Sequence, residues 1–241
     1  MTLSDLADFI TTKLSDTDAA SVAVCKSFIN RRYEMIWDKY LWTETLGVVS
    51  KAVVASDTSL TLDGAPDITF YQSASVPTTF IDFPVATRFT PTGQDDGIEA
   101  IGYDWQTFFQ LDPNVWNDVS GRRATPTGFI NLPKDGSGYC RIKPVPTPDA
   151  AGTLYVLGKL KWVALDDNDS PCLRGVDNAL LAYVEADMLE RARQYGKAQN
   201  KYAEGKALEQ VMTDIEKVQQ ASGSRVVPLE EGYDDPAGGP M

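Results

Sequence analysis

Two helix-patterned segments enclose a long middle that carries strand and turn patterns. Apolar residues recur with helical spacing in residues 15–42 and 173–219. Residues 43–172, between them, hold most of the fourteen prolines and most of the short runs that alternate apolar with polar residues. This layout predicts an α+β fold: a helical bundle formed by the N- and C-terminal helices, with an inserted β-rich (antiparallel) domain and an extended C-terminal tail.

The pattern divides the chain into four expected units. Gly, Pro and acidic residues dominate the last twenty residues, which have too few apolar side chains to fold alone. The expected units are the N-terminal helices of the bundle (1–42), the inserted β-rich domain (43–169), the C-terminal helices of the bundle (170–220) and a flexible tail or docking arm (221–241).

Short polar motifs predict where the helices begin and break. Thr2, followed three residues later by Asp5, has the pattern of a capping box. Ser15–Asp18 offers an N-cap for a second, longer helix. In the C-terminal part, Ser170-Pro171 is expected to start a helix because proline at the first helical position loses no internal hydrogen bond. Gly196 is expected to interrupt that helix.

Several short runs in the middle have strand composition and are bounded by Pro, Gly or Asp. Asp63-Gly64 is a hairpin-type turn dipeptide, and Gly136-Ser137-Gly138 is expected to join two strands as a hairpin turn. The candidate strands are Leu46–Ala55, Asp57–Leu62, Ile68–Tyr71, Thr79–Phe83, Val85–Phe89, Gly128–Leu132, Tyr139–Lys143 and a long strand within Gly152–Leu165.

The net charge of −12 is concentrated in the middle and the tail. Residues 43–172 carry 16 acidic and 9 basic residues, and residues 220–241 carry 4 and 1, whereas the helical segments are nearly balanced. Adjacent basic residues occur only at Arg31-Arg32 and Arg122-Arg123, so the clustered cations of a tight nucleic-acid binder are missing. We expect no sequence-specific DNA binding.

Location is predicted from the absence of targeting patterns. No apolar run approaches the roughly 20 residues that span a bilayer. Asp5 and Asp8 stand where a secretion signal would be basic. The three cysteines, Cys25, Cys140 and Cys172, lack metal or redox spacing and are expected to be reduced and buried. We expect synthesis in a cytosol and no membrane association.

No catalytic constellation is recognisable. The chain has no histidine, which excludes Ser-His-Asp and Cys-His catalysis and histidine-ligated metals. The run Asp166–Asp169 resembles the start of a calcium loop, but Pro171 and Asp177 replace the glycine and glutamate that such a loop needs. We therefore predict that the protein is not an enzyme and has no catalytic residue, metal or cofactor.

A carbohydrate-binding or carboxylate-dependent β-module on a helical stalk remains an alternative. Asp95 and Asp96, or Asp104 with Asp112, could act as a glycosidase pair, which needs one protonated and one charged carboxyl group. Acid pairs beside glycine are more often exposed turns. The aromatic residues Trp105, Phe108, Phe109 and Trp116 are expected to lie in the β-domain core or at a subunit contact.

A second aromatic group ends the first helical segment. Tyr33, Trp37, Tyr40 and Trp42 could stack on bases or sugars. Their spacing places most of them on one helical face, which favours core packing against the C-terminal helices.

This aromatic segment carries a family resemblance. Phe28–Tyr33 followed by Ile36–Trp42 resembles the N-terminal helix of the head-to-tail adaptor (connector) proteins of tailed bacteriophages, which ends in aromatic residues before the first strand. The resemblance continues in order through Thr125–Phe129, Tyr139–Pro146 and the alanine-rich helix Asn178–Gln194.

The resemblance implies a structural virion protein of the phage neck. Such proteins form a ring, usually of twelve copies, that binds the portal, meets a downstream neck or tail protein, and extends the channel through which packaged DNA passes. The tail would then be an arm that docks on a neighbour or on the portal, with the partner-binding residues Val226, Val227, Leu229 and Tyr233. A tail-completion or tail-terminator protein is a structural alternative.

Overall fold

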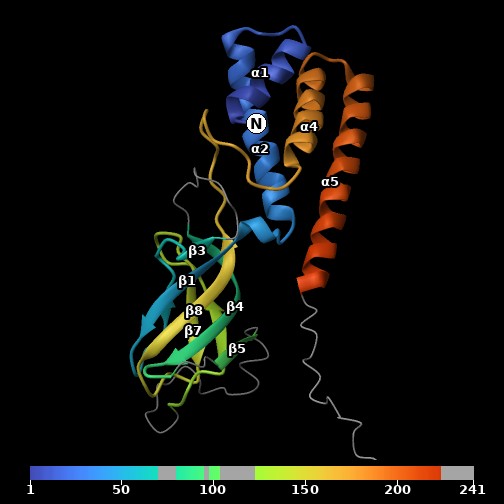
Figure 1. The fold of residues 1–241 in the computed structure, drawn as a ribbon. Coiled ribbons are helices and arrows are strands. Elements are labelled where there is room, and N and C mark those ends of the chain that lie inside the picture. Colours follow the sequence, from blue (N-terminus) through green and yellow to red (C-terminus); the bar gives the residue numbers. More distant parts are fainter. Residues whose placement is uncertain (70–79, 95–97, 104–122, 224–241) are drawn as a thin grey trace, which may run out of the picture.

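The computed structural model describes residues 1–69, 80–94, 98–103 and 123–223 and has an α+β architecture (Figure 1). Helices from the two ends of the sequence pack together, and the strands lie beyond one end of these helices. This arrangement confirms the predicted fold class. The expected tail falls almost wholly outside the described residues.

The bundle has two helices from each end of the chain. α1 and α4 both contact α2, and α5 packs along α4. Thr2 and Asp5 form the predicted capping box, and the Asp18 carboxylate accepts hydrogen bonds from the amides of Ala20 and Ser21. The bundle helices are α1 (Leu3–Lys13), α2 (Ala19–Lys39), α4 (Val176–Arg191) and α5 (Tyr195–Gly223).

Two predicted helix boundaries in the C-terminal part are wrong. α4 begins at Val176 after Gly175, which has φ of 76°, and not at Ser170-Pro171. The residues before it are held by tertiary contacts, because the Cys172 amide donates to the Tyr33 hydroxyl. The break between α4 and α5 lies before Gly196, at Ala192–Gln194, where Arg193 has φ of 59°. Packing and turn geometry outweigh the local Pro and Gly signals here.

The β-rich domain follows a single 3-10 turn, η1 (Thr43–Thr45), and contains eight described strands. Their order is β2-β7-β6-β5-β4-β8-β1-β3, and every neighbouring pair is antiparallel except the parallel pair β5 and β6. The strands are β1 (Leu46–Val53), β2 (Leu60–Thr61), β3 (Ile68–Thr69), β4 (Ile81–Pro91), β5 (Ile98–Tyr103), β6 (Gly128–Leu132), β7 (Arg141–Val145) and β8 (Gly152–Leu160).

The hairpin between β6 and β7 is confirmed, with the Gly138 amide donating to the Asp135 carbonyl. The hairpin expected at Asp63-Gly64 is wrong, because β2 pairs with β7 and β3 pairs with β1 at the opposite end of the strand order. The two strands predicted before and after Pro84 correspond to one strand, β4. Its register with β8 is irregular near the proline. The residues of β4 that pair with β5 are 87–89, so Pro84 lies outside this pairing and needs no amide toward β5.

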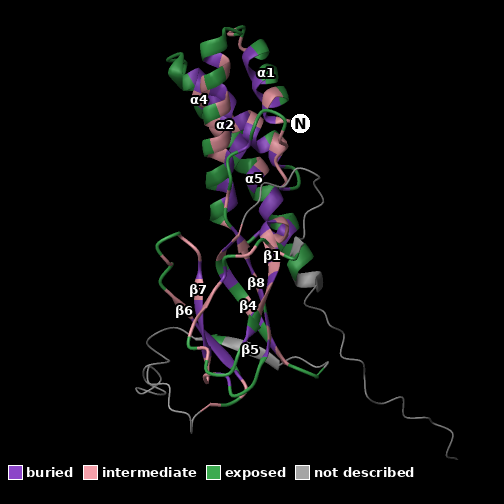
Figure 2. Cartoon of the chain, turned by 90° about the vertical axis from the view of Figure 1, so that its left-hand side faces the viewer, coloured by how far each residue is buried: buried purple, intermediate pink, exposed green. Residues whose placement is uncertain are grey.

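The inner side of the domain and the bundle share one hydrophobic core. Val49, Leu154 and Phe89 are at most 2% exposed and belong to the same cluster as the buried residues of α1, α2 and α4. Figure 2 shows buried residues along the inside of the bundle and down into the strands. The bundle and the β-rich domain are therefore joined by packed side chains rather than by a free linker.

Candidate functional site

The predicted docking residues Val226, Val227, Leu229 and Tyr233 lie outside the described residues. The candidate functional regions are therefore the joint between bundle and β-rich domain, the seam where α2 meets α4 and α5, and the outer faces of the bundle.

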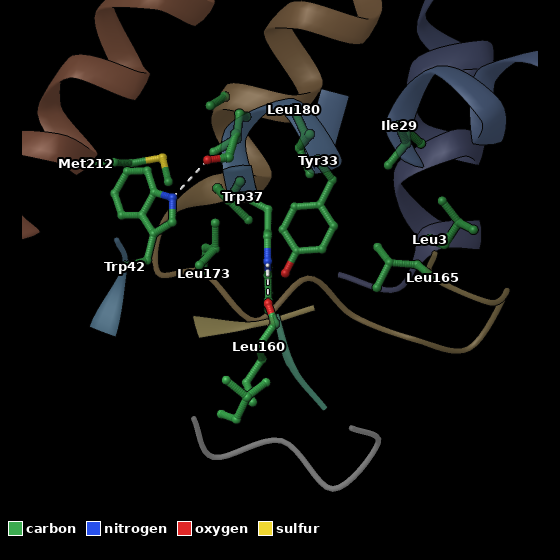
Figure 3. Close-up of a cluster of buried hydrophobic side chains, with 14 of the residues drawn as sticks. Leu3, Ile29, Tyr33, Trp37, Trp42, Leu160, Leu165, Leu173, Leu180 and Met212 are labelled. Atoms are coloured by element: carbon green, nitrogen blue, oxygen red, sulfur yellow. Dashed lines mark hydrogen bonds between the residues drawn. The ribbon is translucent and has the colours of Figure 1, made fainter. Parts of the chain in front are cut away.

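The aromatic residues at the end of α2 form the joint (Figure 3). Tyr33, Trp37 and Trp42 are 2%, 6% and 2% exposed, which confirms their predicted place in the core. Trp37 Nε1 donates to the Leu160 carbonyl at 3.1 Å, and Trp42 Nε1 donates to the Ile36 carbonyl at 2.8 Å. Each indole thus buries a large apolar surface and still satisfies its single donor.

Lys159 fixes the joint from the strand side. Its Nζ donates to the carbonyls of Trp37, at 2.7 Å, and Tyr40, at 3.1 Å. These carbonyls belong to the end of α2, where a helix leaves acceptors without internal partners. Burial lowers the pKa of Lys159 from its ordinary value. The last strand, β8, therefore caps the long N-terminal helix.

The seam where α2 meets α4 and α5 is ionic. The Arg32 guanidinium donates to both carboxylate oxygens of Asp187, at 2.7 and 2.5 Å, and to the Tyr202 hydroxyl at 3.2 Å. The Tyr202 hydroxyl in turn lies 2.5 Å from a carboxylate oxygen of Asp187 and 2.9 Å from one of Glu190, so two acceptors share its single proton. The hydrogen bonds to Asp187 raise the pKa of Arg32, and burial followed by these acidic partners raises the pKa of Tyr202.

Two buried glutamates extend this seam. Glu209 accepts from Lys39 at 2.5 Å and from the Tyr183 hydroxyl at 2.7 Å. Glu216 accepts from the amide and hydroxyl of Thr43 at 2.8 and 2.5 Å. Both glutamates are less than 8% exposed, so each carboxylate exchanges water for protein donors. α5 is thereby held in register with the end of α2 and with η1.

The acidic run Asp166–Asp169 has a structural role. The carbonyls of Asp169 and Asp167 accept from the amides of Leu3 and Ser4, so the loop covers the first turn of α1. The Asp167 carboxylate pairs with Lys26, and Asp169 accepts from the Asp166 amide. No cluster of three metal-ligating side chains occurs among the described residues.

The remaining sequence-derived site residues are only partly described. Asp95, Asp96, Asp104 and Asp112 fall outside the described residues, as do the four aromatic residues between 105 and 116. The three cysteines are free. Burial raises the pKa of Cys25 to about 12 and that of Cys172 to about 11, which keeps these thiols protonated at neutral pH.

Large apolar side chains are exposed on α5. Val211, Ile215 and Val218 are 55%, 45% and 68% exposed and recur at helical spacing, away from the buried face that carries Met212. α5 therefore presents one apolar stripe to its own chain and a second to its surroundings.

Within the described part of the chain, no helix is long and apolar enough to cross a membrane. No protein-family model matches the chain, and no curated protein is significantly similar to it.

Proposed function

We propose that the protein is a structural head-to-tail adaptor of a tailed bacteriophage, a subunit of a ring below the portal that extends the DNA channel. The main support for this proposal is the position of the aromatic segment that resembles the adaptor helix. That segment forms the joint between the bundle and the β-rich domain. The segments that resemble the adaptor helix, Phe28–Tyr33 and Ile36–Trp42, contain the aromatic residues that connect the bundle to the β-rich domain. The aromatic residues of this segment thus have a structural role, which is to connect the two parts of the molecule.

The joint supports the role of a rigid spacer. Trp37 and Lys159 make reciprocal hydrogen bonds between α2 and β8, and the core runs through without interruption. A subunit that must hold two partners at a fixed separation needs such a connection between its parts. Rotation at a flexible linker would lose that separation.

The surfaces also support assembly. The exposed stripe Val211, Ile215 and Val218 is the kind of helix face that packs against another protein. The predominance of acidic over basic residues in the β-patterned middle disfavours adhesion to DNA that slides past. The partners in this proposal are further copies of the chain, the portal protein and a downstream neck or tail protein.

The direct test is purification of a tagged copy from cells that produce the parent particle, followed by mass spectrometry and negative-stain imaging. We expect heads that contain portal protein, with density at the neck. Recovery with tails alone would support the tail-completion alternative. Recovery of no particle protein would refute the assignment.

A truncated chain tests the proposed docking arm. Removing residues 222–241 should abolish attachment to portal-containing heads while the circular dichroism spectrum and unfolding temperature stay close to those of the full chain. A matched control replaces the same residues with a Gly/Ser sequence of equal length, which keeps the chain length but removes Val226, Val227 and Leu229. Normal attachment of either variant would contradict the arm.

A further inference from the structure

The end of the bundle farthest from the β-rich domain carries two turns of opposite charge. At this end α1 leads into α2 and α4 leads into α5 (Figure 1). Residues 8–20 contain three acidic residues and one lysine, whereas residues 188–206 contain five basic residues and two acidic ones. The side chains thus sum to −2 and +3. We call residues 8–20 the acidic hairpin and residues 188–206 the basic corner.

Both surfaces point outward. On α1, Asp8 and Phe9 are exposed, opposite the buried Leu6 and Ile10, and Phe9 is 51% exposed. On the basic corner, Arg191, Arg193 and Lys197 are exposed, and Tyr195 is 59% exposed. Figure 2 shows exposed residues over this end of the bundle. Each surface therefore combines charge of one sign with one large aromatic side chain.

The charges of the two surfaces do not cancel within one chain. Lys13 and Lys201 pair with Glu185, and Lys201 also pairs with Glu204. Among the described residues no ion pair involves Arg191, Arg193, Lys197 or Asp8. Lys13, Lys197 and Lys201 also line an open cleft of about 450 Å³, in which Glu185 is the lining acid. Cationic surface therefore remains available to an external carboxylate.

We propose that the basic corner of one copy binds the acidic hairpin of a second copy. The two surfaces are opposite in charge, and each surface supplies one exposed aromatic residue. Both turns lie at the same end of the bundle, so copies related by rotation about an axis along the bundle keep them at the same height. Pairing of corner with corner, or of hairpin with hairpin, would bring like charges together.

The contact is heterologous, because two different patches of the same chain meet. Such a contact repeats in one direction and closes into a ring when the rotation permits. It supplies the subunit contact for the proposed ring, and in that respect it rests on the proposed function. It can nevertheless be measured on the purified full-length chain without any phage component.

The test uses two variants that reverse one surface each. Arg191→Glu with Lys197→Glu changes the side-chain charge of the corner from +3 to −1, and Asp8→Lys with Thr12→Lys changes that of the hairpin from −2 to +1 at exposed helical positions that cap no helix. Arg174→Glu with Lys217→Glu is the matched control, because it makes the same charge change at exposed positions of α5 and the segment before α4. Circular dichroism and thermal unfolding establish that all variants fold.

Sedimentation velocity over a concentration series to about 1 mM, at low and physiological ionic strength, gives the association constant. We expect the wild-type chain and the control to self-associate, more weakly at higher salt. Each reversed variant alone should associate at least about tenfold more weakly. Several exposed ion pairs between the copies are lost together, and each one contributes only part of this change. An equimolar mixture of the two reversed variants should associate again, because the unaltered hairpin of one variant meets the unaltered corner of the other, and the two altered surfaces are again opposite in charge.

Wild-type protein that stays monomeric over the whole series at low salt would overturn the proposal, as would a mixture that fails to restore association. Wild-type protein whose association stops at a dimer at the highest concentration would contradict the head-to-tail arrangement, because a heterologous contact leaves one free surface at each end of a dimer. These outcomes are independent of the particle purification, so failure of the phage assignment and failure of this interface can be told apart.

Discussion

The joint between bundle and β-rich domain and the seam where α2 meets α4 and α5 connect parts of the same molecule by different chemistry. At the joint, Trp37 and Trp42 are packed in the core and their indoles donate to backbone carbonyls. At the seam, Arg32 and Lys39 meet carboxylates of α4 and α5. The joint derives its stability mainly from apolar burial, and the seam from charge pairs that must remain matched.

This difference predicts how each region responds to change. Apolar packing tolerates changes of pH and salt, and its loss is costly because a cavity remains. A partly buried ion pair adds little net stability, yet removing one partner leaves the other charge without compensation. The seam is therefore suited to fixing the register of α5, while the joint holds the two parts of the chain together.

The largest effect is expected at the joint. Trp37→Ala removes a buried indole and its hydrogen bond to Leu160, and should lower the free energy of unfolding by about 3–5 kcal/mol. Denaturant unfolding measures this loss. Met35→Ala on the exposed face of α2 is the control and should change stability by less than about 0.5 kcal/mol. Equal losses in the two variants would show that the indole is not the anchor of the joint.

A smaller effect is expected at the seam. Asp187→Ala removes the bidentate partner of Arg32 and one acceptor of Tyr202, and should cost about 1–3 kcal/mol because the guanidinium side chain is only 22% exposed. The double variant Arg32→Met with Asp187→Ala removes both charges and should recover part of the loss. A double variant as unstable as the sum of the two single variants would exclude coupling between these residues.

The sequence predicted the helices of the bundle better than the connections between them. The apolar stripes of α1 and α2 and the aromatic face of Tyr33, Trp37 and Trp42 are local patterns, and the structure confirms them. The partners of β2 and β3 are not local, because they depend on strands that lie far away in the chain. A turn dipeptide such as Asp63-Gly64 reports only that the chain bends.

The charged features were missed for a related reason. Counted over whole segments, the helical parts are nearly neutral, and this average conceals both the basic corner and the acidic hairpin. The separation becomes visible only when the ends of the helices are placed in space. Likewise, Lys159 is an ordinary outward residue in the alternating pattern of β8, and its role as a cap of α2 depends on the fold.

Close packing between α4 and α5 gives a third prediction. A Cβ at Gly205 would lie 2.8 Å from a ring carbon of Tyr183, so Gly205→Ala should displace that ring, disturb its hydrogen bond to Glu209 and cost about 1–3 kcal/mol. Gly196→Ala in the same helix meets no atom within 4 Å and should stabilise the protein by up to about 1 kcal/mol. Thermal unfolding of the two variants should therefore shift in opposite directions. A shift in the same direction would mean that helix propensity, rather than contact, governs α5.

The smallest effect is a change in alkaline stability. Burial and acidic partners raise the pKa of Tyr202 above its ordinary value of 10.0, so the folded protein holds this proton more tightly than the unfolded chain. The resulting stabilisation is complete below about pH 10 and is lost as the pH rises further, since the unfolded chain ionises first.

Lys159 has the opposite effect on the pH dependence of stability, because its lowered pKa makes stability increase with pH up to its ordinary value near 10.5. Tyr202→Phe should therefore make the loss of stability between pH 10 and 11.5 shallower, and Lys159→Met should make it steeper. Denaturant unfolding across this pH range measures both slopes, and a Tyr202→Phe slope equal to that of the unaltered chain would exclude the hydroxyl as the titrating group of the seam.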